Sequence, residues 1–130
     1  TFLNYALGKD EEIEFPDYEI CSGGASVFSN YIKKVRVKSV SLTTLLEEFN
    51  INDPYLLDID IKGSEFDVIN DEAIKKFKKV RIEYTADREK NVKLLINKLK
   101  ERGFNEIRVY KHNHLVYDLN AHGTIEAYKM

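Results

Sequence analysis

The chain has 130 residues, of which 43% are hydrophobic, which is enough for one domain with a real core. Charged residues make up 32%, but their signs nearly cancel to a formal charge of −2. This composition excludes a strongly basic surface for nucleic acid or an anionic membrane, and no apolar run approaches the roughly 20 residues that cross a bilayer.

The first third of the chain predicts short strands, turns and one long loop. Residues 2–7 are apolar and strand-like, and residues 12–15 alternate polar and apolar side chains before Pro16. Residues 17–32 carry glycines and serines without periodicity, which is typical of a loop. This loop holds Cys21, the single cysteine, which cannot form an internal disulfide and indicates a reducing, cytoplasmic compartment.

The middle of the chain alternates strands and helices. Residues 35–40 predict a strand, and the hydroxyls of Ser41, Thr43 and Thr44 can cap a short helix after it. A buried strand is expected over residues 55–61. A second helix follows this strand, and Ser64 is its natural N-cap.

The last third predicts a strand at residues 80–84 and a helix at 87–102, which Gly103 caps. Further strands are expected at 105–111 and 114–118, joined by a turn at His112-Asn113, with a final edge strand at 124–128. This order predicts an α/β fold in a single domain over residues 1–130. Its sheet would be a partial Rossmann-like sheet, parallel at the centre with an antiparallel C-terminal hairpin edge.

The strand at residues 55–61 ends in a charged turn, which is the most informative feature of the chain. Asp58 and Asp60 alternate with apolar residues, so both lie on one face of the strand. In open α/β sheets, ligands bind outside the carboxyl ends of the strands, which favours Asp60 and Glu65 as side chains that flank a ligand. The alternative is structural, with Asp60 capping backbone amides of the turn or pairing with Lys62.

Three histidines near the C-terminus offer a weaker metal pattern. His112 and His114 form a His-x-His pair with His122 nearby. A predicted turn separates the first two, and no carboxylate or cysteine clusters beside them. We therefore expect no metal site.

Five segments between residues 4 and 83 carry a family resemblance. Residues 58–65, Asp-Ile-Asp-Ile-Lys-Gly-Ser-Glu, are similar to a Lys-Ile-Asp-x-Glu-Gly-x-Glu signature, and residues 80–83 are similar to a strand that ends in glutamate. The other similar segments are residues 4–15, 22–26 and 40–46. In this order, the segments resemble the FkbM-type S-adenosylmethionine-dependent methyltransferases.

The resemblance implies roles for the residues that match its signature. Asp60 and Glu65 would be catalytic residues at the methyl-transfer cleft, and Gly63 and Glu83 would lie near substrate or cofactor. Lys62 stands where the signature has glutamate, and there it could attract an acidic acceptor. Asp58 stands where the signature has lysine, so the charge pattern of the turn differs from that of the family.

The same resemblance implies S-adenosylmethionine as cofactor and a sugar or small-molecule hydroxyl as methyl acceptor. Family members begin with a strand and a Gly-x-Gly-type loop, which nothing before Asn4 supplies, and residues 22–25 do not open a helix. Because Thr1 is not a methionine and strand-like residues follow at once, we expect the chain to be the C-terminal part of a methyltransferase domain. Such a part would bind S-adenosylmethionine weakly or not at all.

Two functions follow as hypotheses from these patterns. The first is a portion of an O-methyltransferase, and the alternative is a non-catalytic α/β interaction module derived from that fold. In methyltransferase sheets the strand at 55–61 pairs with a strand that this chain does not supply. We therefore expect a bare sheet edge that forms a homodimer or is covered by residues 17–32, and no nucleic-acid or membrane partner.

Overall fold

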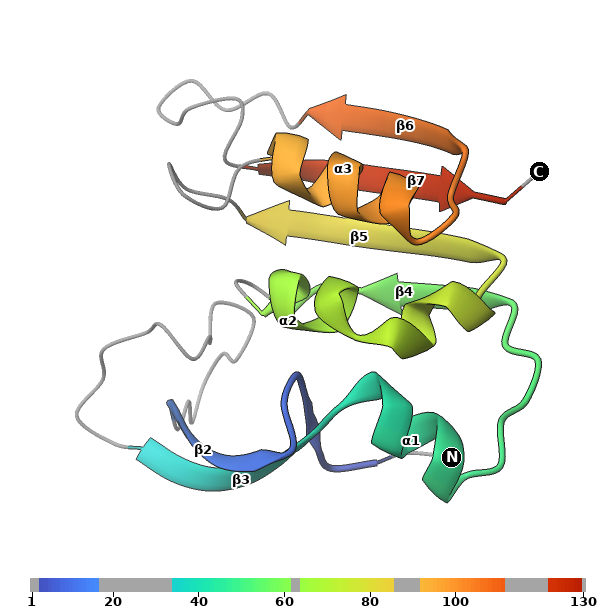
Figure 1. The fold of residues 1–130 in the computed structure, drawn as a ribbon. Helices are drawn as coiled ribbons and strands as arrows, with labels where there is room; N and C mark the ends of the chain where they lie inside the picture. Colours follow the sequence, from blue (N-terminus) through green and yellow to red (C-terminus); the bar gives the residue numbers. More distant parts are fainter. Residues whose placement is uncertain (1–2, 17–33, 62–63, 86–91, 112–121, 130) are drawn as a thin grey trace.

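A mixed sheet with helices on one face forms the body of the protein (Figure 1). The computed structural model describes residues 3–16, 34–61, 64–85, 92–111 and 122–129. Within them, the elements are β1 (Ala6–Leu7), β2 (Glu11–Pro16), β3 (Lys34–Val40), α1 (Leu42–Glu48), β4 (Leu56–Ile59), α2 (Glu65–Asn70), a 3-10 helix η1 (Glu72–Lys76), β5 (Lys79–Thr85), α3 (Val92–Glu101), β6 (Glu106–Lys111) and β7 (His122–Tyr128).

The larger sheet has the strand order β4-β5-β7-β6. β4 and β5 run parallel, with Leu57 opposite Val80, whereas β7 runs antiparallel to both of its neighbours. The combination of a parallel pair and antiparallel strands confirms the predicted α/β class. The parallel pair also brings the carboxyl ends of β4 and β5 to the same edge of the sheet (Figure 1).

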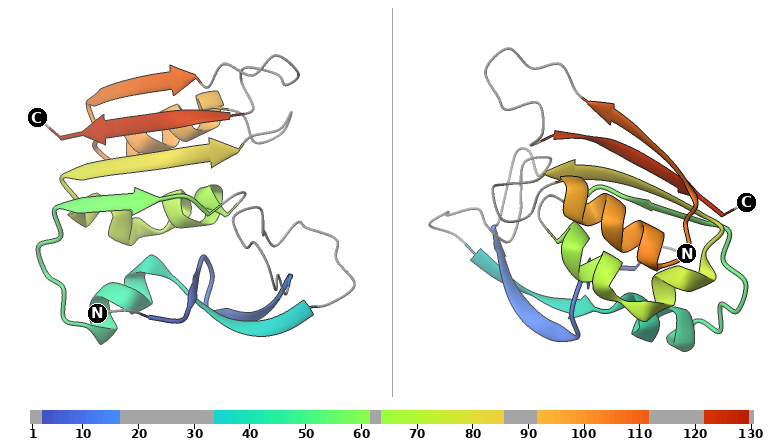
Figure 2. Two further views of the ribbon diagram at one scale, coloured as in Figure 1. Left: turned by 180° about the vertical axis from the view of Figure 1, so that it is seen from behind. Right: turned by 45° about the horizontal axis from the view of Figure 1, so that its top comes forward.

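One face of this sheet is covered and the other is open. Figure 2 shows α2 and α3 on the covered face, and seen from behind, the strands have no described helix in front of them. Val80, Ile82 and Ile125 are fully buried beneath the helices, where Leu95 and Leu99 of α3 meet them in one core. Burial of these apolar side chains is the main force that holds the helices to the sheet.

The place of the last strand differs from the prediction. A strand at 124–128 was expected at the edge of the sheet, but β7 lies between β5 and β6, and β6 is the edge strand. Both sides of β7 are paired, with Ile125 opposite Ile82 of β5 and Val109 of β6, and Ile125 and Ala127 are completely buried, as is usual for a central strand beneath helices. The predicted strand at 114–118 and its turn lie outside the described residues.

A smaller sheet with the order β1-β3-β2 packs beside the larger one. Its first strand is shorter than the predicted residues 2–7, since only Ala6 and Leu7 pair with β3. Asp10, in the turn after β1, fixes this sheet to the start of α1 by accepting hydrogen bonds from the Ser41 amide at 2.8 Å and the Thr44 hydroxyl at 2.8 Å. The Ser41 hydroxyl also accepts from the Thr44 amide, which confirms the predicted N-cap.

The ends of the other helices follow the sequence with one exception. Gly103 ends α3 with a φ of +97°, a conformation that favours glycine and confirms the predicted cap. Ser64 occupies the N-cap position of α2, but its side chain makes no capping hydrogen bond. Glu65 and Asp67 stand in the first turn instead, where their charges favour the positive end of the helix dipole.

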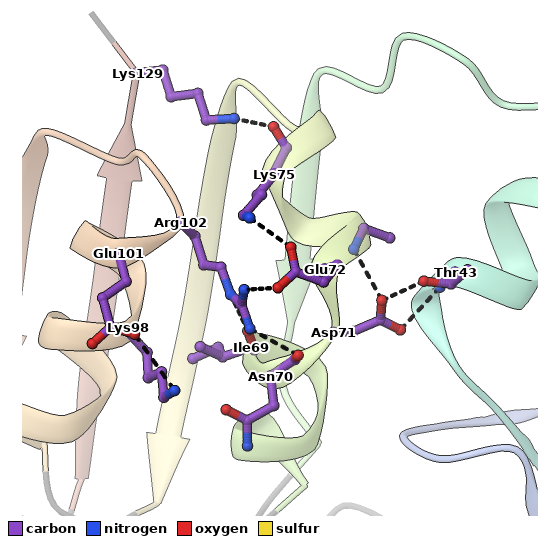
Figure 3. A network of polar contacts seen from close by, with 11 residues as sticks. Thr43, Ile69, Asn70, Asp71, Glu72, Lys75, Lys98, Glu101, Arg102 and Lys129 are labelled. Atoms are coloured by element: carbon purple, nitrogen blue, oxygen red, sulfur yellow. Dashed lines mark hydrogen bonds and ion pairs between the residues drawn. The ribbon is translucent and has the colours of Figure 1, made fainter.

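Arg102 joins α3 to the end of α2 (Figure 3). Its guanidinium donates to the carbonyl oxygens of Ile69 at 3.2 Å and Asn70 at 2.9 Å, and it pairs with Glu72. The Arg102 side chain is only 12% exposed. These bonds satisfy carbonyls that the short helix α2 leaves without intrahelical partners.

Candidate functional site

The parallel register of β4 and β5 places two predicted site residues side by side. Asp58 lies opposite Arg81, and Ile59 lies opposite Ile82. The next step along both strands brings Asp60 beside Glu83 at the carboxyl end of the sheet. The side chains of Asp58, Asp60, Arg81 and Glu83 all belong to the open face, because the intervening residues are buried in the core.

A row of alternating charges crosses the open face one step before this edge. Asp58 forms an ion pair with Arg81 at 3.3 Å, and both side chains are about half exposed. Arg81 also lies opposite Glu126 of β7, which in turn lies opposite Arg108 of β6. Each charge of the row therefore has opposite charges on the neighbouring strands, an arrangement that stabilises a sheet.

The row at the carboxyl end breaks this alternation. Asp60 is exposed and Glu83 is half-buried, and the residue that follows them across the sheet is Thr124. Like charges on directly neighbouring strand positions are unfavourable. Both carboxylates stand at the carboxyl ends of parallel strands, the edge at which open α/β sheets bind ligands. Asp60 and Glu83 are therefore the candidate site residues that the fold brings together.

Glu65 occupies a different environment from Asp60. It is the first residue of α2 and is completely buried, beside Val68 and Ile69 on the inner side of the helix. Asp60 is exposed on the open face. The two carboxylates that were predicted to flank one ligand, Asp60 and Glu65, therefore differ in burial, since only Asp60 is exposed to solvent. Lys62 and Gly63, the other predicted site residues, lie outside the described residues.

A separate open pocket of about 410 Å³ lies between the smaller sheet and α2. It is lined by Gly8, Lys9, Asp10, Ser41, Asp67, Asn70 and Asp71. Lys9 pairs with Asp67 at 3.8 Å, and Asp71 accepts hydrogen bonds from the amides of Thr43 and Ala73. Its carboxylates therefore serve to join the smaller sheet, α1 and η1, and the described site residues Asp60, Glu65 and Glu83 do not line it.

Two residues near the candidate site were missed by the sequence patterns. Arg81 was predicted only to lie in a strand. In both parallel strands the charged residues alternate with apolar ones, and this pattern could have indicated that Arg81 and Asp58 share one face of the sheet. Tyr84 was also assigned only to a strand, but it is 1% exposed and its hydroxyl has no hydrogen-bond partner among the described residues. Burial raises the pKa of this phenol above its usual value, so the hydroxyl keeps its proton.

The described residues show neither a metal-binding cluster nor a membrane-spanning helix. Within them, no group of three or more His, Cys, Asp and Glu side chains is placed to hold a metal ion. No helix of this part of the chain is long and apolar enough to cross a membrane. His112 and His114 lie outside it.

Comparison with known proteins identifies the family of the chain. The family model described as the methyltransferase FkbM domain matches residues 3–113, which include β4, β5 and both strand-end carboxylates. No curated protein and no solved structure matched the chain. The family match confirms the resemblance of the five sequence segments, and the chain belongs to the methyltransferase FkbM domain family.

Proposed function

We propose that the chain forms the acceptor side of an S-adenosylmethionine-dependent methyltransferase site, which O-methylates a hydroxyl of a sugar or another small molecule. Family membership supports methyl transfer. The single observation that carries the proposal is the pair of carboxylates, Asp60 and Glu83, at the adjoining ends of two parallel strands. This is the edge at which open α/β sheets bind their ligands.

Asp60 is the better placed of the two carboxylates to act as a general base, because it is exposed to solvent. Its carboxylate would accept the proton of the acceptor hydroxyl as the hydroxyl oxygen gains the methyl group. S-Adenosylmethionine, when bound, supplies that methyl group from its sulfonium and leaves as a neutral thioether. A general base contributes roughly 10²- to 10⁴-fold to such a step, and correct positioning of the acceptor contributes the rest.

The described residues fit the acceptor better than the cofactor. Carboxylates can accept hydrogen bonds from ribose or acceptor hydroxyls. However, the described glycines have structural positions outside any cofactor-binding loop. Gly8 follows β1, Gly103 caps α3, and Gly123 lies against Tyr84, so none opens a helix as a cofactor loop does. We therefore propose cofactor binding for the full-length protein and weak or no binding by this chain, and we assign no step to residues that would hold it.

The test uses the full-length protein. S-Adenosylmethionine binding is measured by calorimetry, and transfer of a radiolabelled methyl group is measured with a panel of hydroxyl acceptors. We expect Asp60→Asn to lower kcat by about 10²-fold or more with little change in cofactor affinity. Asp58→Asn is the matched control, because Asp58 lies on the same face of the same strand but is held by Arg81, and we expect it to keep activity.

Two results would contradict the proposal. If the full-length protein fails to bind S-adenosylmethionine, the alternative of a non-catalytic interaction module is favoured. If Asp60→Asn and Asp58→Asn lower kcat equally, the strand-end carboxylate has no special role in proton transfer.

A further inference from the structure

The row of residues at the carboxyl end of the open face continues beyond Asp60 and Glu83. Thr124 of β7 lies opposite Glu83, and Tyr110 of β6 lies opposite Thr124. β6 runs in the same direction as β5, because each of them is antiparallel to β7, so Tyr110 stands at the same edge as the two carboxylates (Figure 1). The row therefore contains two carboxylates, a hydroxyl and an aromatic ring at the edge where open α/β sheets bind ligands.

Tyr110 presents a large aromatic side chain to solvent. It is 49% exposed, whereas Ile107 and Val109, on the other face of β6, pack against the hydrophobic core. The Tyr110 side chain therefore belongs to the open face. A single exposed aromatic residue is common on protein surfaces. Tyr110 differs from such a residue because it stands at the ligand-binding edge, in one row with the candidate carboxylates.

Arg108 restrains the ring of Tyr110. The two residues are two positions apart on β6 and so lie on the same face of the sheet. The hydrogen bond that the Arg108 guanidinium donates to Glu106 at 2.9 Å, followed by a hydrogen bond with the Tyr110 side chain, raises the pKa of Arg108. Because its hydroxyl is held in this way, the ring loses less conformational freedom when a ligand binds against it.

The spacing of the row suits a ligand that is wider than one strand. Neighbouring strands are about 4.8 Å apart, so the backbones at Glu83 and Tyr110, on the two strands that flank β7, are about 10 Å apart. Thr124 lies between them and has a short side chain that is only 7% exposed. A ligand that contacts both Glu83 and Tyr110 therefore meets no long side chain of β7 within this row.

A neutral sugar ring matches the chemistry of these groups. Its hydroxyls donate hydrogen bonds, which the carboxylate of Glu83 can accept. Its C–H bonds form an apolar face with a slight positive charge, whereas the face of an aromatic ring is slightly negative. A flexible aliphatic alcohol has no flat C–H face to offer the ring, and the two carboxylates of the row repel an anionic acceptor. The row therefore favours a neutral sugar over both of these classes.

We propose that Tyr110 is an acceptor-binding residue, which stacks its ring on the C–H face of a neutral sugar while Glu83 accepts hydrogen bonds from the hydroxyls of that sugar. Tyr110 thereby selects sugars over other hydroxyl compounds. Asp60, at the other end of the row, remains the general base. This inference rests on the proposed function, because it assigns the acceptor class of the same site.

Sugar binding to the full-length protein tests the proposal without catalysis. The probes are the neutral methyl pyranosides of glucose, galactose and mannose, and binding is titrated by saturation-transfer NMR. We expect at least one pyranoside to bind, with the strongest saturation at the C–H protons of one ring face. Loss of the aromatic ring in Tyr110→Ala should weaken its binding about tenfold or more. Tyr110→Phe keeps the ring, so its affinity should stay within about threefold of wild type.

Two further variants separate stacking from other effects. Tyr110→Leu keeps a large apolar side chain but has no aromatic face, and we expect it to bind the pyranoside as weakly as Tyr110→Ala. Because Tyr110→Phe and Tyr110→Leu both keep a large side chain, a difference between them reports on the aromatic ring and not on folding. Tyr55→Ala is the matched control, since Tyr55 is 66% exposed but precedes β4, at the opposite end of the sheet, and we expect binding as in wild type.

The results distinguish this inference from the proposed function. If no pyranoside binds, or if Tyr110→Leu binds as tightly as Tyr110→Phe, the assignment of Tyr110 to sugar binding is wrong. If the pyranosides bind in the expected pattern but receive no methyl group from S-adenosylmethionine, the sugar site stands and the proposed function fails. If methyl transfer occurs, Tyr110→Leu should raise the KM for the sugar about tenfold with kcat unchanged, and an unchanged KM would contradict the inference while the proposed function stands.

Discussion

At the residue scale, Tyr84 and Gly123 form one packing unit. Tyr84 of β5 lies opposite Gly123 of β7, and its ring crosses the glycine toward β6. A Cβ atom at position 123 would lie 2.4 Å from the Tyr84 hydroxyl oxygen and 2.6 Å from the carbonyl oxygen of Tyr110. Both contacts are far shorter than van der Waals distance, so only glycine fits at this position.

We predict that Gly123→Ala destabilises the protein by about 1–3 kcal/mol, the usual cost of forcing extra atoms into a packed core. Chemical denaturation followed by circular dichroism measures the change. Gly123→Ala should destabilise the Tyr84→Phe variant as well, because the contacts with the Tyr84 ring carbon Cζ and the Tyr110 carbonyl remain. No loss of stability in that background would show that the hydroxyl alone excludes a side chain.

The Tyr84 hydroxyl itself is predicted to cost stability. Among the described residues, this buried donor has no partner, and loss of its hydration costs about 1–3 kcal/mol. Tyr84→Phe keeps the ring and removes the hydroxyl, so we expect the free energy of unfolding to rise by about 1 kcal/mol. Tyr55→Phe is the control, since Tyr55 is 66% exposed and should change stability by less than about 0.5 kcal/mol. A loss of stability in Tyr84→Phe would show that the hydroxyl has a bound partner.

At the element scale, Arg102 holds the C-terminal end of α2 through a planar group with several donors. We predict that Arg102→Ala lowers stability by about 2–3 kcal/mol, because the carbonyls of Ile69 and Asn70 lose a charged donor in a half-buried place. Arg102→Lys should recover less than half of this loss, since an ammonium group cannot reproduce the forked geometry. Arg108→Ala is the control for loss of charge alone, because Arg108 is an exposed arginine on β6. If Arg102→Lys and the wild type have the same free energy of unfolding in urea denaturation, this account is wrong.

Asp10 gives the contact between the β1–β2 turn and α1 a dependence on pH. The hydrogen bond from the Ser41 amide, followed by that from the Thr44 hydroxyl, lowers the pKa of Asp10 below its usual 3.8. A carboxyl whose pKa is lowered by folding contributes stability above its usual pKa, and that contribution is lost as the pH falls through the lower, folded-state value. The contact should therefore be strongest at neutral pH.

We predict that Asp10→Asn destabilises the protein at pH 7, and that the difference from wild type shrinks as the pH falls below 3.8. Urea denaturation at a series of pH values measures it. Asp53→Asn serves as the control, because Asp53 makes an exposed ion pair with Lys78 at 3.7 Å. A difference between wild type and Asp10→Asn that is the same at every pH would show that the contact does not depend on the charge.

The elements also show what the sequence could and could not predict. The alternation of β2 and β3, the Ser41 cap and the Gly103 cap are local signals, and the structure confirms each of them. The buried strand expected over residues 55–61 is shorter, at Leu56–Ile59, and only every second residue of it is buried. The position of β7 is not local. Its burial depends on which strands lie on either side, and this information is spread over β5 and β6. For the same reason, the pairing of Asp58 with Arg81 depends on the register of two strands that are 23 residues apart.

At the scale of the whole molecule, the open face of the larger sheet has a surface unlike its covered face. Asp58, Arg81, Glu126 and Arg108 cross it in alternating sign, and Lys79 lies 4.9 Å from the ring centre of Tyr128. A face of this kind is suited to water rather than to an apolar layer of helices. The candidate site at Asp60 and Glu83 lies at the edge of this hydrated face, where an acceptor hydroxyl can reach it.

Stability should be distributed unevenly between the two sheets. The hydrophobic core is built by β4, β5, β7 and the helices that cover them, whereas the smaller sheet packs Leu7 at the margin of this core and buries Val40 at the end of β3. Its β3 is largely exposed, with Val35 at 43%. Regions with few buried apolar contacts open locally at a lower free energy than the global unfolding of the protein.

We therefore predict two classes of amide in native-state hydrogen exchange. The amides of Ile82 and Ile125, at the centre of the larger sheet, should exchange only through global unfolding, so their exchange free energy should fall steeply with added denaturant. The amides of Ile13 and Val37, paired across β2 and β3, should exchange at a lower free energy with little dependence on denaturant. The same free energy and slope for all four amides would show that both sheets unfold as one unit. In that case the shared core at Leu7, rather than the difference in burial, would control the stability of the smaller sheet.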